Sequence, residues 1–330
     1  ESYKVGQRPK LQWGPWEVIC SCHLLSRPSE EFMFKHKGFY FLPDLANPEY
    51  IDSLEHFVIR DSDVFVVTFP KSGTVWMQNI LSLIYYESHR DGTAKTETID
   101  RVPWLEYNFN KMDYGSRPSP RLFSTHLPYY LAPRDMRNKG AKVIYVARNP
   151  KDVAVSYFHF SKHAFIFEKV PDFNILMERF LSGKGKVSFT AKSSWFDHIR
   201  GWFTHRADYN ILFLTYEEMK KDLRSAVLKI CDFLGKRLTE KELDVVVEKA
   251  TFNNMKSDPR SNYEDKTCIL KKGRDNFLRR GTVGDWKNIM TVAQSEKFNK
   301  VFNEKMKDLP FKDRGTLACP TPPGPDPGKQ

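Results

Sequence analysis

The chain has 330 residues, of which 40% are apolar and 28% charged, so it can bury a sizeable core and is not disordered as a whole. Lysine and arginine outnumber aspartate and glutamate by 52 to 41, a net charge of +11 at pH 7. That charge favours an anionic partner: a nucleic acid, an anionic membrane surface, or a phosphorylated or sulfated small molecule.

The cysteines argue against a disulfide framework and against a metal site. They are five in number, an odd count spread over a long chain, which favours a reduced compartment. Cys20 and Cys22 are too closely spaced for a typical zinc site, and no second pair follows. We interpret them as ordinary thiols and expect no metal.

No membrane segment is expected. The longest uncharged apolar stretch, Val75 to Tyr86, is shorter than the roughly 20 residues that a transmembrane helix needs. The region from Leu11 to Leu25 is interrupted by polar residues and lacks the continuous apolar run of a signal peptide. A cytoplasmic protein without a membrane partner is therefore expected.

Both ends of the chain are rich in proline, glycine or charge and lack periodicity. We expect a loose N-terminal extension over residues 1–34, one domain over residues 35–314, and a disordered Pro/Gly-rich tail over residues 315–330. No internal repeat divides the central part.

Three runs of β-branched and aromatic residues are each followed by a helical pattern, which is typical of βα units on a parallel sheet. The strands are expected at residues 63–69, 141–147 and 210–216. The first helix carries apolar residues at i, i+3, i+4 and i+7, namely Met77, Ile80, Leu81 and Ile84. The second carries Val153, Ser156, Tyr157 and Phe160 at the same spacing, and a helical pattern over residues 217–234 follows the third strand.

These units predict an α/β fold: a single domain with a central parallel β-sheet flanked by helices and a P-loop-like nucleotide-binding turn. Parts of residues 162–192 and 258–280 are polar and poorly periodic, and we expect loops there. Ligands of such sheets bind beyond the C-terminal ends of the strands, so the turns at those ends are the candidate site.

The first turn, Lys71-Ser72-Gly73-Thr74, suits an anion. Helix N-terminal amides point outward there, Gly73 allows close approach, and Lys71 adds a charge; the hydroxyls of Ser72 and Thr74 can donate to phosphate oxygens. The glycines of a Walker A loop are missing, which disfavours nucleoside triphosphate hydrolysis. Taken alone, the turn is equally compatible with an ordinary capped helix start.

Further basic residues follow the second strand and occur near the C-terminus. Arg148 ends the second strand, and Ser156 lies about two turns into the helix after it. Arg279 and Arg280 stand beside Gly281 in a loop suited to a second phosphate, or simply to solvent. With Trp76 as a stacking face for a base, the pattern favours a bisphosphorylated nucleotide.

Four motifs in this order resemble the cytosolic sulfotransferases: residues 68–76 (TFPKSGTVW), 148–160 (RNPKDVAVSYFHF), 279–288 (RRGTVGDWKN) and 287–296 (KNIMTVAQSE). The resemblance covers roughly Lys35 to Phe311 and is strongest to the amine sulfotransferase branch. It implies transfer of a sulfuryl group from 3′-phosphoadenylyl sulfate (PAPS) to a small acceptor amine, phenol or alcohol. The product would be adenosine 3′,5′-bisphosphate, and no metal would be needed.

The resemblance also implies which residues hold the cofactor. The 5′-phosphate and one face of the adenine would be held by Lys71, Ser72, Gly73, Thr74, Val75 and Trp76. The 3′-phosphate would be held by Arg148, Ser156 and the loop Arg279-Arg280-Gly281, and Phe277 and Leu278 beside that loop would also contact the cofactor. The adenine would also contact Phe196, Phe252 and Met255, with Phe196 in place of the family's tyrosine.

His126 matches the family's catalytic histidine, although a lone histidine is otherwise usually structural. A neutral imidazole, with an ordinary pKa near ~6.5, can take the acceptor's proton. Lys71 would neutralise the bridging oxygen of the leaving phosphate, and Ser156 would hold Lys71 away until the acceptor arrives. Ser124 stands where many family members have a lysine, so one cationic stabiliser is absent.

The acceptor pocket is expected to be aromatic. Trp104 and Tyr107 match pocket-lining positions, and Phe39 and Phe165 are further candidates, each equally compatible with the core. Glu106 would either pair with a cationic amine or be a structural carboxylate. The acceptor class stays open at this stage.

Two further points concern partners and rival functions. The spacing of Lys287, Thr291, Val292 and Glu296 resembles the family's dimerisation motif and implies a homodimer, with a plain helix start as the alternative. Rival functions are a P-loop nucleotide phosphotransferase, a nucleic-acid-binding module, and a weakly active sulfotransferase-like nucleotide-binding protein. Because the basic residues fall at nucleotide-binding turns and no nucleic-acid motif is present, we expect no nucleic-acid partner.

Overall fold

The computed structural model describes residues 33–43, 45–86, 96–108, 111–138, 140–164, 169–183, 194–263, 277–312 and 316–317. Cys20, Cys22 and Phe165, and most of the two expected loose ends, lie outside the described residues.

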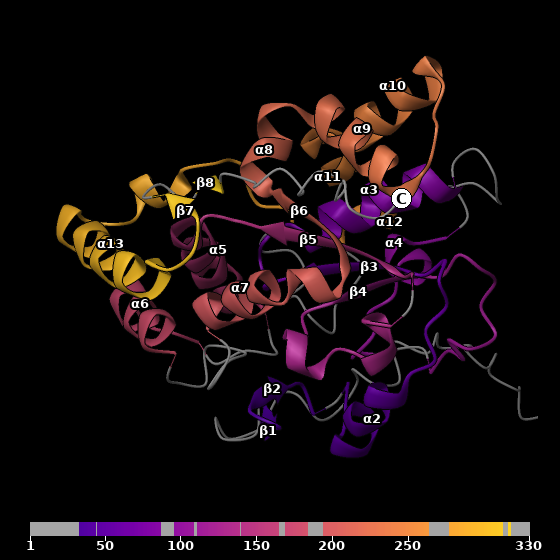
Figure 1. Ribbon diagram of the computed structural model, residues 1–330. Coiled ribbons are helices and arrows are strands. Elements are labelled where there is room, and N and C mark those ends of the chain that lie inside the picture. Colours follow the sequence, from indigo (N-terminus) through magenta and orange to yellow (C-terminus); the bar gives the residue numbers. More distant parts are fainter. Residues whose placement is uncertain are drawn as a thin grey trace, which may run out of the picture.

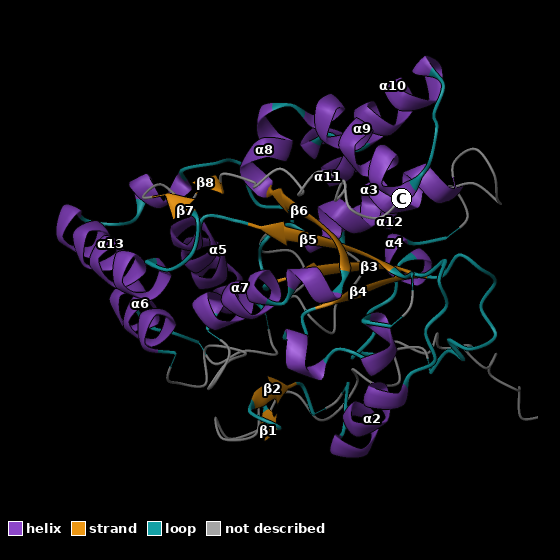
Figure 2. Ribbon diagram, in the orientation of Figure 1, coloured by secondary structure: helices purple, strands orange, loops and turns teal. Residues whose placement is uncertain are grey.

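Four parallel strands form the centre of the protein, in the order β4-β3-β5-β6. Their bounds are β3 (Val64–Thr68), β4 (Leu122–Thr125), β5 (Lys142–Ala147) and β6 (Asn210–Thr215). Val64 of β3 lies opposite Leu122 on one side and Lys142 on the other, so β3 and β5 are the inner strands. All four arrowheads point toward the side of the sheet where α5 begins (Figure 2).

Helices cover both faces of this sheet (Figure 1). The α-helices are α2 (Pro48–Ser53), α3 (Thr74–Tyr86), α4 (Thr98–Arg101), α5 (Pro150–His163), α6 (Phe173–Ser182), α7 (Trp195–Thr204), α8 (Tyr216–Lys221), α9 (Leu223–Leu234), α10 (Glu240–Lys249), α11 (Phe252–Ser257), α12 (Pro259–Asn262) and α13 (Val292–Met306). Short 3₁₀ turns are η1 (Leu54–His56), η2 (Tyr129–Leu131), η3 (Arg134–Met136), η4 (Arg206–Asp208) and η5 (Asp285–Asn288). Two small antiparallel pairs complete the described elements: β1 (Phe34–His36) with β2 (Phe39–Phe41), and β7 (Phe311–Lys312) with β8 (Thr316–Leu317).

Successive residues of each inner strand point to opposite faces and bury against different helices, which explains the layered arrangement. Val64 and Val66 belong to a core built with α3, α9 and α10. Phe65 and Val67 belong to a larger core built with α5, α6, α7 and α13. The strands are buried on both faces, so they are nearly continuous apolar runs in the sequence.

The α/β fold, the parallel sheet and the single domain predicted from the sequence are confirmed, and the three predicted strands coincide with β3, β5 and β6. The helical pattern expected over residues 217–234 is confirmed, and it comprises two helices, α8 and α9. Asp222 interrupts them with an extended backbone, and its side chain accepts a hydrogen bond from Ser225 N–H at the start of α9. A side chain that satisfies a free helical N–H favours such a restart.

Other segments also differ from expectation. The edge strand β4 was not predicted, and α6 lies inside the region expected to contain a loop. At the ends, Met33 and Phe34 pack against the core although the extension was expected to run to residue 34. Thr316 pairs with Lys312 although it falls in the expected tail.

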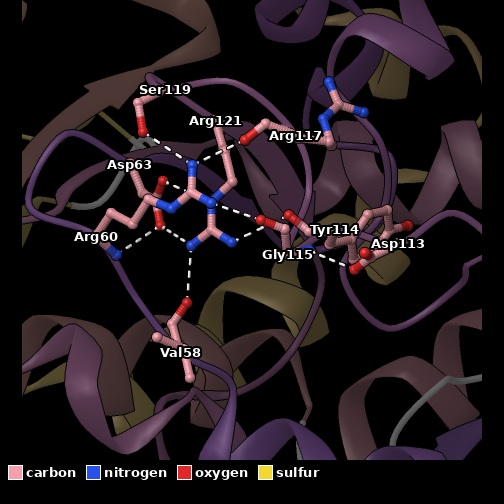
Figure 3. Close-up of polar contacts among 9 residues, drawn as sticks. All are labelled: Val58, Arg60, Asp63, Asp113, Tyr114, Gly115, Arg117, Ser119 and Arg121. Carbon is pink, nitrogen blue, oxygen red and sulfur yellow. Dashed lines mark hydrogen bonds and ion pairs between the residues drawn. The ribbon is translucent and has the colours of Figure 1, made fainter.

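A buried ion pair joins the N-terminal ends of β3 and β4, at the edge of the sheet opposite the strands' C-terminal ends. Arg121 donates to both carboxylate oxygens of Asp63, at 2.9 and 2.5 Å, and also to the carbonyls of Val58 and Tyr114 (Figure 3). Arg121 and Asp63 are 2% and 0% exposed. The pair therefore ties the loop before β4 to the start of β3, away from the candidate site.

Candidate active site

One cavity lies beyond the C-terminal ends of the strands and collects residues from segments far apart in the sequence. Its lining includes the following predicted site residues: Lys71, Gly73, Thr74, Val75, Trp76, Trp104, Tyr107, His126, Arg148, Ser156, Phe252, Met255, Phe277, Leu278, Arg279, Arg280 and Gly281. Residues that sequence reasoning missed also line it: Leu42, Leu45, Pro70, Tyr157, Phe160, Tyr216, Lys220, Tyr263 and Thr282. The lining is cationic at one end and mainly apolar at the other.

The turn between β3 and α3 has the backbone of an anion cradle. Lys71 and Gly73 both have positive φ, 69° and 103°, a backbone curvature typical of anion-binding turns. Glycine is required at position 73 for two reasons: the positive φ, and the Tyr216 ring, which would lie 2.9 Å from a Cβ at this position. The Ser72 hydroxyl, by contrast, is fully buried, does not line the cavity and has no hydrogen-bond partner in the described part of the chain.

Lys71 lies in this cradle, and no carboxylate of the described residues forms an ion pair with it. Its Nζ is 3.7 Å from the centroid of the Phe160 ring and 4.5 Å from that of Phe277. Burial, together with the charges of Arg148 and Arg279, lowers the pKa of Lys71 to about 7. An anion bound here would reverse that effect, since it restores the missing counter-charge.

Arg148 links the turn to the basic loop near the C-terminus. Its guanidinium donates to the carbonyl of Lys71 at 3.0 Å and to that of Thr282 at 3.3 Å, and it lies over the Tyr216 ring at 4.2 Å. Its Nε is buried and has no partner among the described residues. The remaining donor capacity suits an oxyanion at this point.

Two aspartates hold the basic loop in place. Asp285 accepts hydrogen bonds from both Arg279, at 2.5 Å, and Arg280, at 2.6 Å, and these contacts lower the pKa of Asp285 to about 2. Asp152 on α5 accepts from the backbone amides of Gly284 and Trp286. The two arginines are therefore presented as a fixed pair at the cavity.

Gly281 permits a close approach that no other residue could make. Its φ is 62°, and an added Cβ would lie 2.1 Å from the ring of Phe252. Phe252 and the loop thus close the same end of the cavity from two sides. This is a cradle whose shape depends on the missing side chain.

The aromatic end that was expected to hold a base contains Tyr216, not Phe196. The rings of Trp76 and Tyr216 meet edge to face with centroids 5.1 Å apart, and Trp76 Nε1 donates to the carbonyl of Ala250. Phe196 is buried on α7 against Trp195 and Phe302 and does not line the cavity. A tyrosine ring is thus present, but it comes from the start of α8.

His126 follows the edge strand β4, and four groups determine its orientation. Its Nδ1–H donates to the carbonyl of Thr68 at 2.7 Å, so Nε2 is the basic nitrogen of the neutral ring. Its backbone N–H donates to Glu106, and its carbonyl accepts from His198 Nε2–H at 3.2 Å. The Trp104 ring lies 4.5 Å from the imidazole, centroid to centroid.

Burial keeps this histidine neutral. Burial, His198 and Lys71 lower the pKa of His126 to about 3, although the Thr68 carbonyl opposes the shift. His198 is itself held by Tyr145, whose hydroxyl lies 2.9 Å from His198 Nδ1. The imidazole of His126 is thus uncharged at neutral pH, with Nε2 unprotonated.

The apolar end of the cavity surrounds His126. Trp104 and Tyr107, both predicted for the acceptor pocket, line it, together with Leu42, Leu45 and Tyr157. Phe39, which is 1% exposed, lies in the core beside Phe41 and does not line the cavity. Leu42, close to it in the sequence, does line the cavity. Glu106 is fully buried behind the cavity and does not line it.

Ser124 takes part in a buried polar chain. Its hydroxyl accepts a hydrogen bond from Gln78 Nε2 at 2.7 Å, and Gln78 Oε1 accepts one from the hydroxyl of Tyr263 at 3.0 Å. Ser124 itself is 0% exposed. The neutral residue at this position is therefore built into the packing between β4 and α3.

Comparison with known proteins identifies the family. Residues 61–310 match the model of the sulfotransferase domain. The chain belongs to the sulfotransferase family. The resemblance stated from the sequence motifs is thus confirmed, and the family decides against a nucleotide phosphotransferase or a nucleic-acid-binding module.

Several known sulfotransferases are similar to this chain over most of its length. The chain is 53% identical to the amine sulfotransferase of Oryctolagus cuniculus over 287 residues, covering 86% of this chain and 94% of that protein. It is 41% identical to sulfotransferase 2B1 of Rattus norvegicus over 307 residues, covering 92% and 88%. The crystal structure of mouse sulfotransferase SULT7A1 complexed with PAP is similar with a TM-score of 0.70 at 32% identity, covering 84% of this chain and 95% of that one.

The enzyme is thus a sulfotransferase whose cavity is lined by a set of cationic side chains and by a neutral histidine. Within the described ranges, no helix is long and apolar enough to cross a membrane. In the same residues, no group of three or more His, Cys, Asp or Glu side chains is arranged to hold a metal ion.

Proposed function

We propose that this sulfotransferase transfers the sulfuryl group of PAPS to a neutral, hydrophobic acceptor, an amine or a phenol. The observation that carries the proposal is that one cavity is lined both by Lys71, Arg148 and Arg279 and, next to an apolar pocket, by His126. Similarity to a sulfotransferase complexed with PAP supports the donor, and 53% identity to an amine sulfotransferase supports an amine acceptor.

The residues present fit a nucleotide with two phosphate groups. The cradle at Lys71 and Gly73 suits one phosphate, and the unpartnered Nε of Arg148 with the Arg279–Arg280 pair suits the second. Trp76, Tyr216, Phe252 and Met255 would surround the base, with Tyr216 taking the place we expected for Phe196. The missing side chain of Gly281 lets the ring of Phe252 pack against the loop that carries Arg279 and Arg280.

When bound, PAPS would supply an activated sulfuryl group attached through a bridging oxygen to its 5′-phosphate. His126 would accept the acceptor's proton at Nε2, since Nδ1 carries the proton bonded to Thr68. Lys71 would stabilise the negative charge that grows on the bridging oxygen. Lys71 Nζ rests over Phe160, one turn beyond Ser156 on α5, which is consistent with Ser156 controlling its reach.

The acceptor is proposed to bind uncharged. The charged groups of the described lining, Lys71, Arg148, Lys220, Arg279 and Arg280, are cations, and Glu106 is separated from the cavity. Burial raises the pKa of Glu106 to about 7, which disfavours its charged form as a partner for an ammonium group. We therefore favour Glu106 as a structural carboxylate rather than a cation-binding one.

The test is a transfer assay with sulfur-labelled PAPS over aryl and alkyl amines, phenols, alcohols and steroids, without added metal. Transfer to an amine or phenol is expected, and a His126→Ala variant should lose about 10²–10⁴-fold in kcat while still binding adenosine 3′,5′-bisphosphate. His205→Ala, a histidine stacked on Tyr129 outside the cavity lining, is the matched control. Binding of the bisphosphate without transfer to any acceptor would leave only a nucleotide-binding protein.

The proposals on assembly and location rest on the sequence features described above. We propose a cytoplasmic homodimer that forms through Lys287, Thr291, Val292 and Glu296, all of which are exposed at or near the start of α13. Thr291 also caps that helix by accepting from Gln294 N–H, so its presence alone does not require a partner.

A further inference from the structure

Two hydroxyl groups connect His126 to the phosphate cradle through hydrogen bonds. The Thr68 hydroxyl lies 3.2 Å from His126 Nδ1 and 2.6 Å from the Thr74 hydroxyl. Thr68 ends β3 and is 0% exposed, whereas Thr74 begins α3 and lines the cavity. The two ends of the proposed reaction, base and phosphate site, are therefore joined by two hydroxyl groups.

The direction of this chain follows from its first member. Nδ1 must carry a proton, because it lies 2.7 Å from the Thr68 carbonyl, which can only accept. The Thr68 hydroxyl therefore accepts at its His126 side. Between Thr68 and Thr74 either hydroxyl can be the donor, and we assign Thr68 as the donor because its proton is not used toward His126. Thr74 then accepts from Thr68 and has its proton left to donate onward from the wall of the cavity.

We propose that Thr68 is a positioning residue that couples proton uptake at His126 to the charge of the anion held at the turn of residues 69–74. This rests on the function proposed above. As the acceptor's O–H or N–H proton moves to Nε2, the ring becomes an imidazolium and Nδ1–H becomes a stronger donor. Each hydroxyl along the chain is polarised in the same sense, which strengthens the last hydrogen bond.

The charges at the two ends of this hydrogen-bonded chain would change at the same time during the proposed transfer. The acceptor atom forms its bond to sulfur while the bridging S–O bond breaks, and the electron pair of that bond goes to the 5′-phosphate. Negative charge therefore grows at the cradle just as positive charge grows at His126. The Thr68–Thr74 chain lies between these two charges with its dipoles aligned to stabilise both.

The decisive variant is Thr68→Val, which keeps the β-branched shape in a buried strand and removes only the hydroxyl. Thr68→Ser keeps the hydroxyl without the methyl group and should retain the coupling that Thr68→Val loses. Ser82→Ala is a matched control, since it removes another fully buried hydroxyl from α3, about two turns beyond Thr74. Thr74 is retained in all three proteins.

The first readout does not depend on turnover. ¹⁵N chemical shifts of the His126 ring are recorded with and without adenosine 3′,5′-bisphosphate. In the wild type, binding should shift Nδ1, because the anion orients the chain; in Thr68→Val the shift should be lost although the bisphosphate still binds by calorimetry. An Nδ1 signal that responds equally in both proteins overturns the coupling.

The second readout is the split between kcat and KM with PAPS and the best acceptor of the transfer assay. Thr68→Val should lower kcat about tenfold, equivalent to ~1.4 kcal/mol of transition-state stabilisation, with the KM values little changed. Thr68→Ser and Ser82→Ala should retain wild-type kcat. Unchanged kcat in Thr68→Val contradicts the coupling but not the proposed function, whereas failure of the wild type to bind the bisphosphate contradicts both.

Discussion

The backbone N–H of His126 donates a hydrogen bond to Glu106 Oε1 at 2.7 Å. The backbone of the proposed base is therefore held in place by a fully buried carboxyl group. Glu106 Oε2 is buried without a hydrogen-bond partner among the described residues. One oxygen therefore positions the active-site chain while the other is left unsatisfied. Such an arrangement is costly when the group is charged and cheaper when it is protonated.

Replacing Glu106 with glutamine should change the pH dependence of stability. Burial raises the pKa of Glu106 from 4.5 to about 7, so the folded wild type binds a proton more tightly at this carboxyl than the unfolded chain does. The protonated carboxyl therefore stabilises the folded state at low pH, and this part of the free energy of unfolding is lost as pH rises from about 4.5 to about 7. Glu106→Gln removes the titration and keeps an acceptor for His126 N–H. Relative to the wild type, the variant should gain on the order of 3 kcal/mol between pH 4.5 and 7.5, at about 1.4 kcal/mol per pKa unit.

Urea unfolding at several pH values measures this difference. The slope with pH is the test, because the amide group also changes the packing by an amount that does not depend on pH. Glu178→Gln is a suitable control, since Glu178 is exposed and pairs with Lys297 on the surface. Parallel pH profiles for wild type and Glu106→Gln would contradict the assignment.

Lys71 should take up a proton when a phosphate group binds beside it. Its pKa of about 7 means that roughly nine-tenths of this side chain is neutral at pH 8. A phosphate in the cradle favours the charged form and raises the pKa, so binding at pH 8 should take up roughly one proton, and binding at pH 6 far less.

Calorimetric titration of adenosine 3′,5′-bisphosphate in buffers of different ionisation enthalpy measures that number. Lys71→Met should abolish the uptake at pH 8 and weaken binding. Lys220→Met is the matched control, because Lys220 lines the same cavity and its loss should leave the proton count intact. Equal uptake in Lys71→Met and wild type would assign the proton to another group.

Sequence patterns predicted the parts of this fold that are strongly periodic. β3, β5 and α3 are long, buried and apolar, and the turns after β3 and β5 place Lys71 and Arg148 at one edge of the sheet. β4 was missed because it has only four residues, Leu122 to Thr125, and two of them are polar. Its parallel pairing with β3 depends on contacts about 58 residues apart, as in the Thr68–His126 hydrogen bond, which no local window contains.

The sequence motifs predicted the charged residues of the candidate site. They did not predict the aromatic residues whose positions depend on tertiary packing. Tyr216 carries no signal of its own, since a tyrosine at the start of a helix is as often structural. Its place beside Trp76 and Arg148 follows from the pairing of β5 with β6, which brings Thr215 next to Ala147. Phe196 was proposed from a local match of letters, whereas the packing of α7 against α13 turns its ring into the core.

Breaking the Asp63–Arg121 ion pair should destabilise the protein without altering the chemistry of the site. Asp63→Asn leaves the buried guanidinium of Arg121 uncompensated, which costs about 3–5 kcal/mol in comparable cases. Arg134→Ala is the comparison, because it breaks an ion pair with Glu55 in which Arg134 is 70% exposed and should cost less than about 1 kcal/mol. Chemical denaturation measures both, and bisphosphate affinity of the folded fraction should stay at the wild-type value. Similar losses for the two variants would contradict the role of burial.

The exposed start of α13 gives a direct test of the proposed dimer. Val292 is 76% exposed, so its side chain is accessible to a partner subunit. Val292→Glu adds a charge to that surface and should shift the protein from dimer to monomer at micromolar concentration, as measured by analytical ultracentrifugation. Leu228→Glu, at a 48% exposed apolar position on α9, is the matched control and should leave the mass unchanged. A wild-type protein that sediments as a monomer at the same concentration would contradict the dimer, and Val292 would then be only a solvent-exposed residue beside the Thr291 helix cap.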